Sequence, residues 1–334
     1  KKLREISKYL IRIDRPLDQD SQTKKSKHHH HKKAKKHKSE ESTDPNTNLT
    51  IPDYQEEEED EFNNFDNIQQ YKLKKTDYIQ DEWPIVSTKI YKIYTGQLIS
   101  TKEAITITVL DSAKNSEDKF KRLKDVLTAV HHPYLETFIG AVEKPLPSVI
   151  ITRRKGEKLS EILRRAKQKS KQKVTDENDD ENLIELKPGY RTIIAFNVAS
   201  AMAYLHSIHI IHRDLSASSI LVDKSFIPRI TNFANSRFLP EENTFLTAKP
   251  VSSSYFVAPE LTVDEDYDET VDVFSFGGIL YEMLVGKAPF SGYSREEVEN
   301  KLSKGERPPF PPEISDDLRN LIESCWSQDP RKRP

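Results

Sequence analysis

The side chains best suited to chemistry stand in two short polar stretches of the chain. The first is His212-Arg213-Asp214, and a serine-rich loop leads from it to Ser219, whereas the second begins at Asn232. A carboxylate such as that of Asp214 is a candidate general base. Magnesium is a hard cation that binds through carboxylate and phosphate oxygens, so the amide of Asn232 and the hydroxyl of Ser219 would make a poor site for it.

These stretches resemble the catalytic loop and the metal-binding segment of a protein kinase, whose patterns are His-Arg-Asp-Leu-x-x-x-x-Asn and Asp-Phe-Gly. Asp214 stands at the position of the catalytic base, and Ser219 stands at the position of the asparagine. Asn232-Phe233-Ala234 stands where the family has Asp-Phe-Gly. The resemblance therefore covers the architecture of the loop but not its metal ligands, and no metal site is predicted.

The resemblance extends over residues 85–334, because further motifs follow in the order of the kinase family. It implies an α+β, bilobal protein-kinase fold, with a small β-rich N-lobe that has one main helix and a large, mostly helical C-lobe. The pair Cys325-Trp326 is similar to the tyrosine-kinase and tyrosine-kinase-like branches of the family. The other matching motifs are Ala258-Pro259-Glu260, Asp272 at the helix-F aspartate, and Arg333 at the final arginine.

The pattern of apolar residues predicts the elements that must position these motifs. Runs rich in β-branched and aromatic residues predict strands, and apolar residues at helical spacing predict helices. Strands are expected at 85–94, 104–110, 134–142 and 148–152, and helices at 116–130, 191–206, 271–285 and around Leu318, Leu321, Ile322 and Trp326.

Blocks of like charge mark chain that is expected to lie outside a packed core. Residues 24–38 are almost all lysine and histidine, and residues 56–61 are all acidic. Such blocks cannot bury enough apolar surface to offset the entropy of ordering. A disordered N-terminal region is therefore predicted at 1–76 and a low-complexity insertion at 164–187. The kinase-like domain is predicted at 77–334, with its N-lobe at about 77–152 and its C-lobe at about 157–334.

Several residues that bind and polarise ATP in the kinase family are replaced in this chain. The glycines of the phosphate-covering loop fall on Val86, Thr88 and Tyr91, whose side chains would block close backbone contact. Thr108 replaces the phosphate-binding lysine, and Leu123 replaces its glutamate partner. The resemblance assigns a degenerate ATP pocket to Ile93, Thr106, Thr108, Thr152, Leu221 and Asn232.

The residues that hold the kinase fold together are retained. Glu260 and Arg333 match a pair that forms a buried ion pair in the large lobe. Asp272 matches the aspartate that holds the backbone of the catalytic loop. The apolar spine that links the two lobes is matched by Leu127, Phe138, His212 and Phe233.

This division between lost and retained residues predicts a pseudokinase that acts as a scaffold or allosteric partner of other proteins, an active kinase among them. Losing one preorganised electrostatic partner typically costs ~3 kcal/mol. The lost partners are at Thr108, Asn232, Ser219 and Ser216, whereas a general base contributes only ~10²–10⁴-fold. Asp214 is then expected to be a vestigial base that accepts hydrogen bonds within its loop. No cofactor is firmly predicted, and ATP without magnesium is the candidate.

The alternative is an atypical active Ser/Thr protein kinase that transfers phosphate from ATP to proteins. The with-no-lysine kinases show that a lysine from a neighbouring strand can replace the missing one, and Lys89, Lys92 or Lys102 could do so here. Such a replacement would leave the metal site unrepaired. In either case a phosphate added to the segment 235–257 could pair with Arg213. The candidate acceptors are Thr244, Thr247, Ser252, Ser253 and Ser254.

The composition of the whole chain narrows its environment and partners. The 52 Lys and Arg residues nearly balance 54 Asp and Glu residues, and the net charge of −2 gives no general attraction to nucleic acid. Only the basic block at 24–38 could bind nucleic acid, hold a metal or direct nuclear import. The single cysteine, Cys325, fits a reducing compartment. No membrane span is predicted, and the expected location is intracellular, cytoplasmic or, through the basic block, nuclear.

Overall fold

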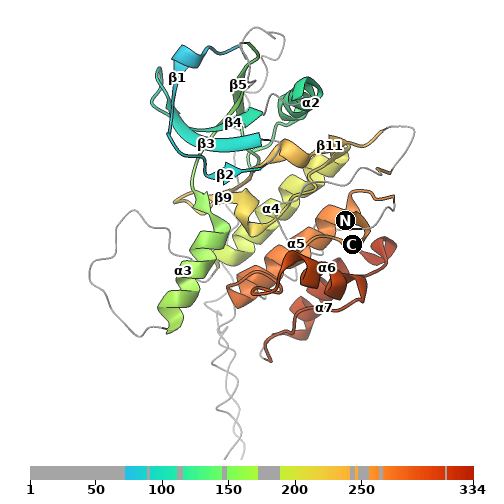
Figure 1. The fold of residues 1–334 in the computed structure, drawn as a ribbon. Coiled ribbons are helices and arrows are strands. Elements are labelled where there is room, and N and C mark those ends of the chain that lie inside the picture. Colours follow the sequence, from blue (N-terminus) through green and yellow to red (C-terminus); the bar gives the residue numbers. More distant parts are fainter. Residues whose placement is uncertain are drawn as a thin grey trace, which may run out of the picture. The chain divides into compact units, whose positions relative to one another are not determined.

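A computed structural model describes residues 72–88, 91–110, 116–144, 149–171, 189–240, 245–246, 256–262, 266–312 and 314–334 (Figure 1). These residues form a small lobe built on a β-sheet and a larger lobe built mainly from helices. This is the α+β, two-lobed arrangement predicted from the sequence. The charged blocks at 24–38 and 56–61 lie outside the described residues.

The small lobe is a six-stranded antiparallel sheet in the order β1-β3-β4-β6-β5, with β2 also paired to β3. The strand predicted at 104–110 is confirmed, whereas the run predicted at 85–94 is divided between β2 and β3. The strands are β1 (Tyr78–Gln80), β2 (Val86–Ser87), β3 (Tyr91–Leu98), β4 (Ala104–Leu110), β5 (Phe138–Val142) and β6 (Val149–Arg153).

Strand β4 alternates isoleucine and threonine, and the pleat sends the two types to opposite faces of the sheet. Ile105 and Ile107 are fully buried in an apolar cluster on one face. Thr106 and Thr108 take the other face, and Thr108 lies in register with Ile93 of β3. This alternation decides which side chains of β4 can reach a site below the sheet.

One helix of the small lobe, α2 (Ser116–Ala129), contacts strands β4, β5 and β6. Phe120, Leu123 and Leu127 recur at helical spacing on its buried side, and Val130 is buried just after its end. The helix predicted at 116–130 is therefore confirmed, together with its apolar stripe.

The large lobe surrounds a helix, α4, whose stripe of Ile194, Val198, Met202 and Leu205 is buried. The helices predicted at 191–206 and 271–285 are confirmed, and none of the described helices is long and apolar enough to cross a membrane. The helices are α3 (Leu159–Lys171), α4 (Tyr190–Ser207), α5 (Thr270–Val285), α6 (Arg295–Ser303) and α7 (Asp316–Cys325). Short strands β7 (Glu157–Lys158), β9 (Ile220–Val222) and β10 (Pro228–Ile230) form one sheet, and β8 (Ile210–Ile211) pairs with β11 (Arg237–Phe238).

The first residues of the predicted insertion belong to α3, which continues to Lys171. Leu159, Ile162 and Leu163 bury the first turns of this helix. One turn further on, the Lys167 ammonium donates to the carbonyl oxygen of Val285 at 2.7 Å, which ties the basic part of α3 to the end of α5. Residues 172–187 of the predicted insertion lie outside the described residues.

An aromatic cluster closes the large lobe beside α5. A Cβ atom at Gly277 would lie 2.7 Å from the Trp326 ring, so glycine is required for the indole to pack against the helix. Phe256, Phe274 and Phe310 pack around this indole or one another. The prediction that Trp326 lies inside the last helix is wrong, because α7 ends at Cys325 and Trp326 is its C-cap residue.

Candidate functional site

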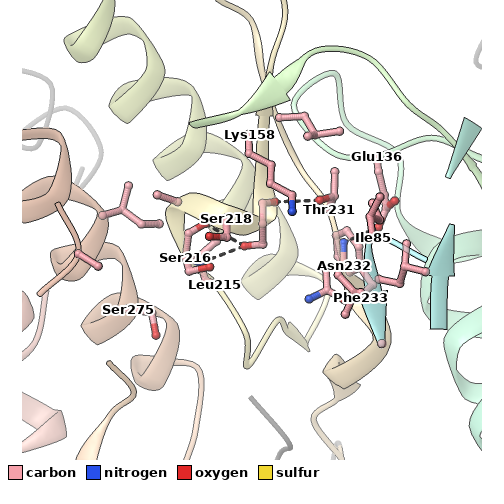
Figure 2. A pocket seen from close by; sticks show the side chains of 18 of the residues that line it. Ile85, Glu136, Lys158, Leu215, Ser216, Ser218, Thr231, Asn232, Phe233 and Ser275 are labelled. Atoms are coloured by element: carbon pink, nitrogen blue, oxygen red, sulfur yellow. Dashed lines mark hydrogen bonds between the residues drawn. The ribbon is translucent and has the colours of Figure 1, made fainter. Parts of the chain in front are cut away.

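One cleft brings together the pocket residues named from the sequence. It has a volume of about 540 Å³ and lies between the small-lobe sheet and the loop that enters β9, and it continues along α5. Figure 2 shows Asn232 and Glu136 toward one end of the cleft and Ser275 toward the other. The six predicted residues all line it: Ile93, Thr106, Thr108, Thr152, Leu221 and Asn232. Their role in binding a nucleotide stays a prediction.

The sheet contributes hydroxyl groups to the cleft and no cation. Thr106 and Thr108 face it because of the alternation in β4, and Thr152 of β6 lies in register with Thr106. Leu123 of α2 also lines the cleft and is buried, as expected for an apolar side chain at a lost ion pair. At Thr108 and Leu123 the cleft therefore has no charge that could balance a phosphate.

Among the described residues, two cations line the cleft, Lys158 of β7 and Arg154, and the sequence analysis singled out neither. Figure 2 shows the Lys158 side chain beside Thr231. Of the predicted replacement lysines, Lys92 is exposed on β3 and Lys102 is exposed in a turn, and neither lines the cleft. Lys89 lies outside the described residues. The sequence does not show that Lys158 lines the cleft, because the direction of its side chain depends on how β7 pairs with β9.

Asp214 is buried next to the cleft, and its carboxylate contacts other parts of the protein. Its Oδ2 accepts a hydrogen bond from Asn232 Nδ2 at 2.9 Å and a longer one from Asn235 Nδ2 at 3.5 Å. These two donors lie in the turn at Phe233–Asn235 and in the residue before it, outside the catalytic loop. Both bonds go to Oδ2 and turn the Asp214 carboxylate toward this segment.

The serines of the catalytic loop are used within the loop itself. Ser219 Oγ donates to the carbonyl oxygen of Ser216 at 3.0 Å and accepts from the backbone N–H of Ser216 at 2.9 Å. Ser219 is buried. These contacts shape the turn at Ala217–Ser219 that leads into β9, and they leave one neutral hydroxyl where the family has a metal-binding amide.

Asn232 occupies an unusual backbone conformation that its side chain and its amide N–H both support. Its φ of 71° and ψ of 55° lie in the left-handed region, which asparagine tolerates better than most residues. The backbone N–H of Asn232 donates to Glu136 Oε1 at 2.8 Å, while its side chain donates to Asp214. Asn232 therefore bridges two carboxyl groups.

Glu136 is a further cleft residue that the sequence analysis missed. It lies at the buried end of the cleft, 7% exposed, where its Oε1 accepts a hydrogen bond from the backbone N–H of Asn232 at 2.8 Å and where the Phe233 backbone and the Thr152 hydroxyl are near its carboxyl. Burial raises its pKa to about 7, against the lowering effect of these hydrogen bonds. The sequence did hold a signal for this residue, because Glu136 is a single glutamate among mostly apolar residues before β5. A glutamate is rarely buried without partners, so this position indicates a carboxyl that is bound within the protein.

Tyr91 fills the space that the third glycine of the phosphate-covering loop would leave open. Its side chain is 3% exposed and lies on the same face of β3 as Ile93. Burial and the nearby Asp214 carboxylate raise the pKa of Tyr91 to about 12, and a hydrogen bond with Asn232 lowers it. The phenol ring therefore reaches the residue that stands at a metal-ligand position.

The backbone of the catalytic loop is held from below by Asp272 of α5. Its carboxylate accepts from the backbone N–H groups of His212 and Arg213, each at 2.8 Å, and contacts His206 Nε2 at 3.1 Å. Burial raises the pKa of Asp272, but His206 and the His212 backbone outweigh it, so the pKa is lowered. The match of Asp272 to the helix-F aspartate of kinases is thus reproduced in its contacts.

The donor set of the cleft does not fit a magnesium triphosphate. The metal-ligand positions hold a hydroxyl and an amide that bond within the protein, and Thr108 supplies no cation for a phosphate. Within the described part of the chain, no three His, Cys, Asp or Glu side chains are grouped so that they could hold a metal ion. Hard cations prefer oxygen ligands with negative charge, and the carboxyl groups of Asp214 and Glu136 already accept hydrogen bonds from Asn232.

The order of these elements and their contacts agree with a comparison against known families. The model of the protein tyrosine and serine/threonine kinase family matches residues 85–334. The chain belongs to the protein kinase family. The cleft is accordingly the one between the two lobes of a kinase domain, and Asp214 lies in its catalytic loop.

Individual relatives are similar over this kinase domain. A probable serine/threonine-protein kinase of Dictyostelium discoideum is 40% identical over 155 residues, which make up 46% of this chain and 17% of that protein. The dual specificity protein kinase pyk3 of the same organism is 30% identical over 275 residues, 81% of this chain and 19% of the relative. Serine/threonine-protein kinase 12 of Arabidopsis thaliana is 33% identical over 236 residues, 67% of this chain and 47% of the relative. The chain thus spans less than half the length of each.

Proposed function

We propose that this kinase domain is a pseudokinase of the tyrosine-kinase-like type, which acts by binding other proteins as a scaffold or allosteric partner. The observation that carries the proposal is the hydrogen bonding of Asn232, whose side chain donates to Asp214 and whose backbone donates to Glu136. The residue at the position of a metal ligand is therefore engaged with the residue at the position of the base. The pair Cys325-Trp326 supports the tyrosine-kinase-like assignment.

The energetic argument compares what is lost with what could remain. Each missing electrostatic partner costs ~3 kcal/mol in the transition state, and such losses are large even though they do not add. The missing partners stand at Thr108, Asn232, Ser216 and Ser219. General base catalysis by Asp214 contributes only ~10²–10⁴-fold, which does not offset the loss of several partners.

A transfer assay with the purified chain tests the proposal. Labelled ATP and magnesium are supplied with a generic protein substrate, and we expect no transfer above the level of Asp214→Ala. The matched control is Asp118→Ala, an exposed aspartate in the first turn of α2. Transfer that Asp214→Ala abolishes and Asp118→Ala preserves would contradict the pseudokinase assignment.

The second candidate is an active Ser/Thr protein kinase, and two observations favour it. Asp214 is retained, and relatives such as serine/threonine-protein kinase 12 of Arabidopsis thaliana bear the name of active enzymes. Thermal unfolding with ATP, in the presence and absence of magnesium, separates the candidates, since a ligand that binds the folded state raises the Tm. A magnesium-dependent rise supports the enzyme, whereas a rise without magnesium, or none, supports the pseudokinase.

The remaining proposals concern the chain around the domain. We place the kinase domain at 77–334 after a charged region at 1–76, with protein partners contacted through that region, the insertion and the activation segment. An intracellular, cytoplasmic location agrees with the single buried thiol of Cys325. Fractionation of cells that express the full-length protein, with and without residues 24–38, tests the location and the role of the basic block.

A further inference from the structure

The turn that follows β10 is tied to the segment before β5 by both backbone and side chain. The backbone N–H of Ile230 donates to the Tyr134 carbonyl at 2.9 Å, and the N–H of Glu136 donates to the Ile230 carbonyl at 2.8 Å. Of the N–H groups that follow, that of Thr231 donates to the Ser219 carbonyl at 2.8 Å and that of Asn232 donates to Glu136 Oε1 at 2.8 Å, and the Phe233 N–H is near the same carboxyl. Glu136 thus closes the series of bonds between the two segments.

The N–H groups of Asn232 and Phe233 need an acceptor, because the turn is folded into the interior. Phe233 is fully buried and makes an edge contact with the His212 ring at a centroid distance of 5.0 Å. Asn232 lies in the left-handed region, so its N–H cannot join a regular strand ladder. A buried N–H without an acceptor is costly, and the acceptor that the structure supplies is Glu136.

The neutral side chain at position 232 is compatible with the buried carboxyl of Glu136. Asn232 stands between the carboxyl groups of Glu136 and Asp214, and it presents N–H groups to both. An aspartate at this position would place a third carboxylate among them, which like charges oppose. The neutral amide and the buried glutamate are therefore compatible with each other, whereas an aspartate would need a cation to accompany it.

We infer that Glu136 is a positioning residue that replaces the metal ion, because its carboxyl holds the turn at Asn232–Asn235 in place without metal or nucleotide. The turn carries Phe233, a member of the spine that links the lobes. No ligand is therefore needed to fix the relative arrangement of the lobes. The inference concerns how the cleft is held and is independent of whether the domain transfers phosphate.

Hydrogen–deuterium exchange on the full chain in EDTA tests the inference. Glu136→Met keeps the length of the side chain but removes both acceptors, and we expect the amides of Asn232 and Phe233 to exchange at least about tenfold faster. Amides of β4 should not change. Glu136→Gln keeps one acceptor oxygen and should restore part of the protection, which a change in packing alone would not do.

The matched control for this experiment is Glu143→Met, which removes an exposed carboxylate just after β5. It should leave the exchange of the turn as in the unaltered chain. Unchanged protection of Asn232 and Phe233 in Glu136→Met would overturn the inference. So would an unaltered chain in which these amides become protected only when magnesium and ATP are added.

A double-mutant cycle tests the match between the two positions. Asn232→Asp places a carboxylate beside Asp214 in either background, but beside Glu136 only when that residue is present. In EDTA at pH 8, above the Glu136 pKa of about 7, we expect Asn232→Asp to lower the Tm more in the unaltered chain than in Glu136→Met. Additive losses would overturn the charge argument. Turnover in the transfer assay would contradict the proposed function and leave the exchange results standing, so the two failures are distinguishable.

Discussion

At the scale of single residues, the cleft is defined by which side chains carry charge and which donors they meet. Thr108 and Leu123 remove an ion pair from the sheet and the helix, while Glu136 adds a carboxyl at the buried end. Asn232 satisfies that carboxyl and Asp214 together. The carboxyl groups at this end of the cleft therefore meet donors that the protein itself supplies.

The raised pKa of Glu136 makes the stability of the domain depend on pH. Burial raises the pKa to about 7 from an ordinary value of 4.5, so the folded state favours the protonated carboxyl. The stabilisation from this group is complete below pH 4.5 and is lost as the pH rises through 7. Glu136→Gln, which cannot ionise, should therefore gain relative to the unaltered chain between pH 5 and pH 8, by about 3 kcal/mol at most.

Thermal unfolding of both proteins across this range measures the difference. Glu143→Gln is the control, because Lys124 lowers the pKa of Glu143 and its contribution is lost only below the ordinary range of a glutamate. Its difference from the unaltered chain should be flat from pH 5 to pH 8. A flat difference for Glu136→Gln as well would contradict the expected titration.

At the scale of elements, α5 positions the catalytic loop through one carboxylate. Asp272 is 1% exposed and accepts the N–H groups of His212 and Arg213. Asp272→Ala would leave these buried donors without an acceptor, so we expect a loss of about 3 kcal/mol in the free energy of unfolding. Denaturant unfolding measures it, with Asp125→Ala on the exposed face of α2 as the control. A loss no larger than the control's would contradict this role.

Three elements also bring arginines together: Arg122 of α2, Arg213 of the catalytic loop and Arg237 of β11. Burial, together with the charges of Arg213 and Arg122, lowers the pKa of Arg237 to about 10. Mutual repulsion in a partly buried group of cations favours an anion. This group would suit a phosphate on the activation segment, most of which lies outside the described residues.

Inorganic phosphate should therefore stabilise the folded chain, by about 1.4 kcal/mol at a tenfold excess over its Kd. The comparison is made against chloride at the same ionic strength, and the Tm reports the difference. The stabilisation should shrink in Arg237→Gln and persist in Arg295→Gln, an arginine of α6 paired with Glu299. Equal responses in the two variants would show that phosphate acts without this group.

At the scale of the whole molecule, a buried ion pair joins distant parts of the large lobe. The Arg333 guanidinium bonds both carboxylate oxygens of Glu260, one of them from Nη2 at 2.9 Å. Arg333 Nη1 also donates to the Thr270 carbonyl at 3.1 Å. The last residues of the chain are thereby tied to the start of α5 and to the Ala-Pro-Glu motif, as the sequence predicted.

Breaking this pair from one side should be costly, because it leaves a buried charge unpaired. We expect Glu260→Gln to lose about 3–5 kcal/mol in the free energy of unfolding. The exposed pair Arg295–Glu299 is the comparison, with N···O at 3.7 Å, and Glu299→Gln should cost well under 1 kcal/mol. Chemical denaturation of the two variants checks the contrast, and similar small costs would show that the buried pair is dispensable.

The regular elements and the retained motifs could be predicted because their signals are local. The stripes of α2 and α4 recur at helical spacing, and the alternation in β4 already separates its threonines from its isoleucines. Motif order placed Asp272 and Glu260 in their roles. The contacts observed for both follow from those positions, since the loop and the ion pair need a buried carboxylate at each.

What the sequence by itself determined was the two-lobed fold and six of the residues that line the cleft. Only the tertiary structure decided what those residues bind within the protein. The Asp214 carboxylate accepts a hydrogen bond from Asn232, and Glu136 enters the site from a segment almost a hundred residues from Asn232 along the chain. Hydrogen bonds between distant segments depend on side-chain direction and burial, which no local pattern of residue types encodes.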